Sequence, residues 1–232
     1  MRRAFTEELQ FISDQLVEMT RLTSTALDRA TTALLTADLE LAEAVISADD
    51  TIDRVRRDLD NRAVDVLARQ QPVATDLRQL VMAMRMSSDL ERMGDLARHV
   101  AKLTRLRYPH KVLRGPLEPM FTRMAEVAED LVSEAGRIIA NNDVEAVPQL
   151  LVTDDEMDDL HREVFRTLLA DDWGHGVEAA IDATLLSRYY ERFGDHAVSI
   201  AQRVVYLVTG EWPEEDLHIE ERMDVSRVEP LG

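Results

Sequence analysis

The sequence predicts an all-α protein made of two tandem three-helix bundles, which are related by an internal repeat. Three observations lead to this fold class. The 232 residues are 45% hydrophobic but only 5% aromatic, with 8 glycines and 7 prolines, and helix-forming Ala, Leu, Glu and Arg abound. Apolar residues recur at alternating spacings of three and four, the period of one helix face. Two segments about 100 residues apart show the same pattern and share a short motif.

The first predicted bundle covers residues 1–108. Pro72 separates its second helix from its third, and we expect Thr75 or Asp76 to cap the third helix. The three apolar stripes of this bundle run over residues 5–30, 41–66 and 86–104.

A linker is predicted at residues 109–116, where prolines, a glycine and a basic cluster interrupt the helical pattern. The second bundle follows at 117–210, with stripes over 117–138, 150–168 and 186–204, and Gly210 closes it. Residues 211–232 contain eight acids and two arginines without periodicity, which predicts a disordered acidic tail.

The chain carries a net charge of −18 and contains no cysteine. An acidic chain repels phosphates, so direct nucleic-acid binding is not expected. The lack of cysteine excludes disulfides and thiolate metal sites, and it is compatible with the cytoplasm. We find no signal peptide and no apolar window long enough for a transmembrane segment, which leaves peripheral docking on a membrane complex open.

Carboxylates recur four residues apart, and therefore on one face of a helix. The first half holds the pairs Asp49/Asp53 and Glu91/Asp95. Shifting these pairs by 105 and 100 residues gives the second-half pairs Asp154/Asp158 and Glu191/Asp195. Because each pair flanks an apolar seam, antiparallel packing would bring four carboxylates of each half together.

Like charges at this spacing destabilise a helix by a few tenths of a kcal/mol per pair. A single pair on so acidic a chain would be an ordinary solvated face, but four pairs in repeat register favour a bound cation. Oxygen ligands suit Mg, Mn, Fe or Zn. Gly94 and Gly194, which stand inside the repeated motif Glu-Arg-x-Gly-Asp, indicate the close approach of either a helix or a ligand. His99 and His196 lack counterparts in the other half, so we expect them to be structural.

The segment 67–78, which leads into Ser87-Ser88-Asp89-Leu90-Glu91-Arg92-Met93-Gly94-Asp95, resembles the PhoU family of phosphate-signalling regulators. The segment 190–197, Tyr-Glu-Arg-Phe-Gly-Asp-His-Ala, is similar to that family's repeated motif. The resemblance covers residues 1 to about 210 and is closest to the actinobacterial, PhoY-like members.

This resemblance implies two three-helix bundles in a cytoplasmic protein that is often a homodimer. It implies a non-enzymatic adaptor that links the phosphate ABC transporter, through its ATPase component, to a sensor histidine kinase and represses signalling when phosphate is plentiful. It also implies a multinuclear iron or zinc cluster, with Mg or Mn as alternatives. The implied metal ligands are Asp49, Asp53, Glu91, Asp95, Asp154, Asp158, Glu191 and Asp195.

Two departures and two alternatives accompany the resemblance. Asp89 becomes Tyr189 and Ser88 becomes Arg188 in the second half, so if these positions tune a cluster, the two sites should differ and the second should be weaker. A carboxylate-bound metal enzyme and a metal-buffering helical protein are the competing functions. The sequence contains no Gly-rich phosphate loop, nucleophile elbow or His-Glu-x-x-His motif to favour an enzyme.

Overall fold

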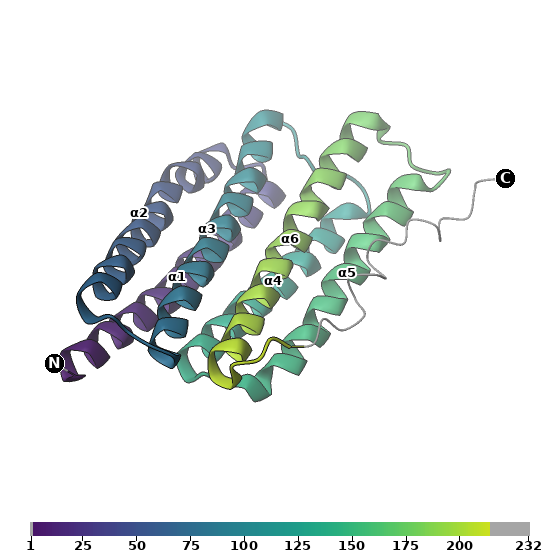
Figure 1. The fold of residues 1–232 in the computed structure, drawn as a ribbon. Helices are drawn as coiled ribbons and strands as arrows, with labels where there is room; N and C mark the ends of the chain where they lie inside the picture. The colour runs from purple at the N-terminus through teal and green to yellow at the C-terminus, as the bar shows by residue number, and fades with distance from the viewer. Residues whose placement is uncertain (1, 214–232) are drawn as a thin grey trace.

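The computed structural model describes residues 2–213, which form a bundle of long helices (Figure 1). Within these residues the chain contains six α-helices, one short 3-10 helix and no strand, so the predicted all-α class is confirmed. The predicted acidic tail lies, from residue 214 onward, outside the described residues. The elements are α1 (Arg2–Thr36), α2 (Leu39–Gln70), α3 (Thr75–Arg107), α4 (Leu117–Asn141), η1 (Val144–Ala146), α5 (Val147–Leu169) and α6 (Gly176–Thr209).

Local signals set several of the helix ends. Asp38 precedes α2, and its Oδ1 accepts a hydrogen bond from the backbone N–H of Leu41 at 2.9 Å, as an N-cap does. Asn142 follows α4 and Gly210 follows α6, both in the left-handed conformation, with φ of 50° and 84°. This is the common way to end an α-helix, and it confirms that Gly210 closes α6.

The expectation that Thr75 or Asp76 caps the third helix is wrong. The cap position is occupied by Ala74, which has a φ of 51° and offers no side-chain hydrogen bond. Thr75 and Asp76 already belong to the first turn of α3. There the carboxylate of Asp76 still complements the positive end of the helix dipole.

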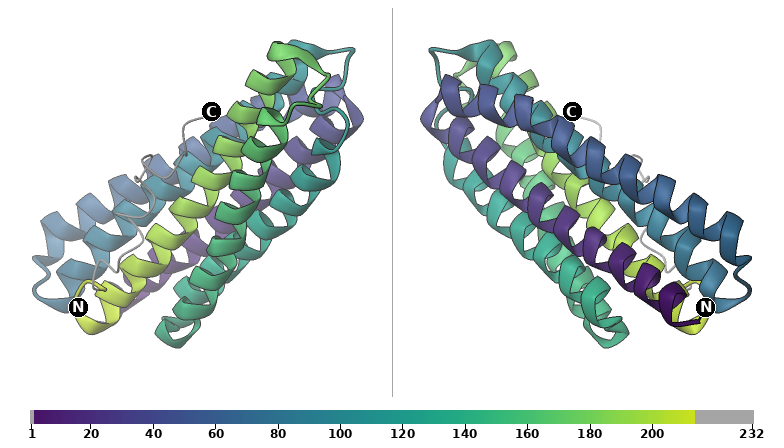
Figure 2. Two further views of the ribbon diagram at one scale, coloured as in Figure 1. Left: turned by 90° about the vertical axis from the view of Figure 1, so that its right-hand side faces the viewer. Right: turned by 90° about the vertical axis from the view of Figure 1, so that its left-hand side faces the viewer.

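The helices form two three-helix units side by side, α1–α3 and α4–α6 (Figures 1 and 2). Helices α1, α3, α4 and α6 occupy the middle, because α1 contacts α4 and α3 contacts α6. Among the described residues α2 contacts only α1 and α3, and α5 contacts only α4, α6 and η1, so these two helices flank the molecule on opposite sides. None of the described helices is long and apolar enough to cross a membrane.

One buried hydrogen bond crosses the boundary between the two units. The hydroxyls of Thr31, on α1, and Tyr190, on α6, lie 2.6 Å apart. Tyr190 is fully buried with its ring edge against Phe121, and burial raises the pKa of its hydroxyl. The hydrogen bond therefore keeps a polar group satisfied in the middle of the aliphatic core.

A polar network joins α3 to α6. Asp89 lies 3.2 Å from His196 Nδ1 and forms an ion pair with Arg203, whose Nε is 3.0 Å from its Oδ2. The rings of His99 and Tyr189 lie 5.3 Å apart in the same interface. The Asp89/Tyr189 difference between the repeats thus lies at the contact between the two units, and His196 is a structural histidine here.

We expect Thr31→Val to lower the free energy of unfolding by about 1–3 kcal/mol, because it leaves the Tyr190 hydroxyl buried without a partner. Urea unfolding of Thr31→Val, of Tyr190→Phe and of the double variant that combines them measures the effect. The double variant removes both hydroxyls and should recover most of the loss. A double variant as unstable as the sum of the two singles would contradict the importance of this bond.

Burial, with smaller effects of Lys102 and Arg98, lowers the pKa of His99 despite the opposing charge of Asp95. The folded protein therefore holds this histidine neutral at a pH where the unfolded chain protonates it. The stability that follows is present above about pH 6.5 and is lost as the pH falls through the lowered pKa.

We accordingly expect the free energy of unfolding to decline less steeply between pH 7 and pH 5 in His99→Gln than in the unmodified protein. Denaturant unfolding at several pH values measures the slope. His110→Gln, which changes an exposed linker histidine, is the control and should keep the original slope. An unchanged slope in His99→Gln would contradict the assignment.

Candidate functional site

The first-repeat carboxylates line the contact between α2 and α3, and we call Asp49, Asp53, Glu91 and Asp95 the first seam. Asp49 is only 6% exposed. Burial raises the pKa of Asp49 more than Arg98 lowers it, and the three neighbouring carboxylates raise it further. Burial also raises the pKa of Glu91, with the charge of Asp95 adding to the effect. These four carboxylates therefore act electrostatically on one another, as the spacing predicts.

Gly94 allows α2 and α3 to approach closely at the first seam. A Cβ atom at this position would lie 2.8 Å from Ile52 Cδ1 and 3.6 Å from Asp49 Oδ1. The first distance is too short for an ordinary contact, so a larger residue would force the Ile52 side chain to shift. Of the two explanations for this glycine, the structure supports close helix approach.

A guanidinium group lies between the carboxylates of the first seam. Arg98 donates one hydrogen bond to Asp49 and another to Asp95, and thus bridges α2 and α3. Arg92 adds an outer contact, with Nη1 3.2 Å from Asp95 Oδ2. Sequence reasoning missed Arg98, although the register comparison contained a signal, because the matching residue 100 positions later is Val198.

The second-repeat carboxylates line the contact between α5 and α6, and we call Asp154, Asp158, Glu191 and Asp195 the second seam. Asp154 is 2% exposed and lies against Gly194, where a Cβ would be 2.8 Å from its Oδ1. The second glycine thus makes room for a carboxylate as well as for a helix. Arg188 forms an ion pair with Glu191 from a half-exposed position.

His161 adds a nitrogen donor to this part of the molecule. It follows Asp158 by three residues on α5. Burial, aided by the charge of Arg188, lowers its pKa so that the imidazole stays neutral, although a backbone hydrogen bond with Ser187 opposes this shift. Its Nδ1 is buried without a hydrogen-bond partner among the described residues. A neutral imidazole with an unpaired nitrogen is the form that binds metal ions.

The two seams suit a metal ion to different degrees. In the first seam Arg98 already lies between two of the carboxylates, so the arrangement does not fit a cluster there. The second seam offers carboxylate oxygens and the orphaned His161 nitrogen, which fit in chemical kind. Within residues 2–213, however, no group of three or more His, Asp or Glu side chains is placed to hold a metal ion. The eight carboxylates therefore stay a prediction as metal ligands.

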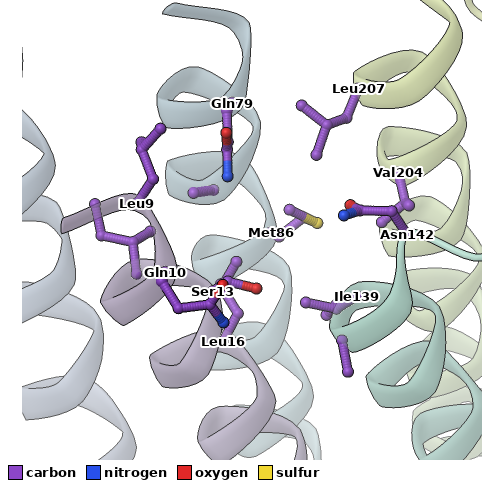
Figure 3. A pocket seen from close by; sticks show the side chains of 13 residues that line it. Leu9, Gln10, Ser13, Leu16, Gln79, Met86, Ile139, Asn142, Val204 and Leu207 are labelled. Atoms are coloured by element: carbon purple, nitrogen blue, oxygen red, sulfur yellow. The ribbon is translucent and has the colours of Figure 1, made fainter. Parts of the chain in front are cut away.

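A small cavity lies apart from both seams, between the start of α1 and the end of α6 (Figure 3). Its volume is about 90 Å³, well below that of a typical ligand pocket. Its lining is mainly apolar with a few amide and hydroxyl groups, and contains no titratable side chain. The cavity therefore offers no titratable acid or base for catalysis. The lining residues labelled in Figure 3 include Leu9, Leu16, Gln79, Met86, Ile139, Asn142, Val204 and Leu207.

Comparison with known proteins gives the same two-repeat division. The PhoU domain matches the chain twice, over residues 16–104 and 121–204. The phosphate-specific transport system accessory protein PhoU homolog 2 of Mycobacterium tuberculosis is 46% identical over 213 residues, which are 92% of this chain and 100% of that relative. PhoU homolog 1 of Mycobacterium leprae is 45% identical over 216 residues, which are 93% of this chain and 97% of that relative.

Solved structures share the fold. The crystal structure of PhoU from Pseudomonas aeruginosa superposes with a TM-score of 0.82 at 30% identity, over 89% of this chain and 100% of that one. The phosphate transport system regulatory protein PhoU from Streptococcus pneumoniae gives a TM-score of 0.80 at 24% identity, which supports the fold alone. Because both repeats match the domain and the similarity runs through nearly the whole chain, this protein belongs to the PhoU family.

Proposed function

We propose that this protein is an accessory protein of a phosphate transport system, and that it works in the cytoplasm as a non-enzymatic adaptor. The observation that carries the proposal is the end-to-end match to relatives named phosphate-specific transport system accessory proteins.

In this proposal the adaptor links the transporter's ATPase component to a sensor histidine kinase and represses phosphate-starvation signalling when phosphate is plentiful. To do so, it must bind the signalling-off state of the kinase more tightly than the signalling-on state, since equal affinity would shift nothing. A bundle with one continuous core suits this task, because it can present a fixed surface to two partners.

An exposed apolar strip near the start of α6 supports a docking role. Val177, Ile181 and Leu185 follow one another at intervals of four residues and are 76%, 54% and 43% exposed. Contiguous exposed apolar groups are typical of protein contacts. The adjoining turn carries Asp171 and Asp172, so the strip fits an apolar surface with a basic rim. We propose that a partner protein of the phosphate transport system docks there.

Deletion of the gene should switch on phosphate-starvation genes in phosphate-rich medium, and the unmodified gene should silence them again. A reporter fused to a starvation-induced promoter measures this. Ile181→Asp should fail to restore silencing, because a charge in the strip opposes apolar docking. Val64→Asp, which changes an exposed valine on α2, is the matched control and should restore it. A deletion strain that stays silent would refute the adaptor role.

We further propose that a divalent metal ion binds at an acidic seam, with the second seam the better candidate. Asp154, Asp158, Glu191 and Asp195 would hold the ion, and His161 could complete the set. The bound ion would supply positive charge that neutralises the seam and clamps α5 to α6. The buried carboxylate of Asp154 and the unpaired nitrogen of His161 support this proposal.

Elemental analysis of natively expressed protein tests the metal proposal. We expect bound Fe, Zn, Mn or Mg in the unmodified protein and a loss of most of it when the four second-seam carboxylates are changed to alanine. The control changes four exposed acids away from the seams, namely Glu7, Asp65, Glu126 and Glu163. Equal metal content in all three proteins would refute the site and leave the adaptor role standing.

A further inference from the structure

The two seams differ at the position that Arg98 occupies in the first seam. In the first seam, the guanidinium of Arg98 donates to Asp49 on α2 and to Asp95 on its own helix. In the second seam the residue at the same register is Val198, which is 8% exposed and packs in the core. An aliphatic side chain supplies neither charge nor a hydrogen-bond donor there.

Arg188 does not replace Arg98 in the second repeat. It stands three residues before Glu191, corresponds to Ser88 in the first repeat, and reaches Glu191 from a half-exposed position. Arg98 instead is mostly buried and spans two helices, one of them through the nearly inaccessible carboxylate of Asp49. The first seam therefore has a counterion that bridges its two helices, and the second seam has no arginine at the matching position.

A guanidinium held by two carboxylates competes directly with a metal ion. Charge-assisted hydrogen bonds of this kind are stronger than neutral ones, and a metal ion would have to break both of them. It would also have to enter beside a fixed positive charge, whose repulsion is weakly screened in a partly buried position. The position that a metal would need is thus taken by the protein's own side chain.

We propose that Arg98 is the resident cation of the first seam and that it keeps divalent metal ions out of that seam. The two repeats are then not two copies of one metal site, and the second seam is the stronger candidate rather than the weaker one. The placement of metal in the second seam rests on the proposed function, whereas the role of Arg98 does not.

Replacing Arg98 by the residue at the matching position of the second repeat tests its role. Zn²⁺ is titrated calorimetrically into chelator-treated, full-length protein. Arg98→Val, which copies the second repeat, should gain one Zn²⁺ site per chain that binds at least tenfold more tightly than any first-seam binding in the unmodified protein. Adding Asp49→Asn to this variant should remove the gained site. In the unmodified background, Asp49→Asn should leave Zn²⁺ binding unchanged.

Two further variants keep the test decisive if Arg98→Val does not fold without metal. Arg98→Gln keeps a hydrogen-bond donor but removes the charge, and should also gain the site. Arg98→Lys keeps the charge and should gain none. Arg105→Val, which removes an exposed arginine from the same helix, is the matched control and should bind as the unmodified protein does.

The outcomes separate this inference from the metal proposal. If neither Arg98→Val nor Arg98→Gln gains a site, or if Asp49→Asn removes Zn²⁺ from the unmodified protein, the inference is overturned. If the unmodified protein binds no Zn²⁺ while these variants gain a site, Arg98 has the proposed role and the second-seam metal proposal fails. If both proposals hold, Val198→Arg should lose the Zn²⁺ binding that the unmodified protein shows.

Discussion

Each three-helix unit buries a carboxylate in the contact between two of its helices, and this buried charge has to be compensated. Asp49 and Asp154 are 6% and 2% exposed, and each lies against a glycine of the neighbouring helix. A charge removed from water in this way destabilises the fold unless a partner compensates it. The glycines bring the helices close, and that closeness makes compensation necessary.

The groups that compensate the buried carboxylate differ between the two repeats. Arg98 bridges the first seam from within, whereas the second seam has Val198 at the matching position, Arg188 paired with Glu191 and a neutral histidine nearby. The difference between Asp89 in the first repeat and Tyr189 in the second has another cause. Residues two apart on a helix point to nearly opposite sides, so Asp89 faces α6 while Glu91 faces α2. The α3–α6 contact, not the seams, accounts for that difference.

The same arrangement suits the proposed adaptor role. The four middle helices share one core, and buried polar contacts tie the two units together. Seams and strip lie on the flanking pairs, so charge compensation in a seam acts on the packing of an outer helix. A regulator needs such a fixed body, because it shifts a partner's equilibrium only through a surface that favours one state.

By itself, the sequence determined the helices, the end of α6 at Gly210, the two-repeat order and the acidic pairs. These are local properties: an apolar stripe shows within one helix, and two carboxylates four residues apart share a face in any helix. The cap of α3 was predicted wrongly, because the left-handed backbone of Ala74 shifts the boundary and no side-chain preference shows it.

Only the tertiary structure decided which groups meet across helices. Arg98 reaches a carboxylate 49 residues away, and Asp89 meets a histidine 107 residues away, distances over which no periodicity operates. A valine in place of an arginine can be read from the aligned repeats. The importance of Arg98 becomes visible only once the packing of α2 on α3 places its guanidinium between two carboxylates.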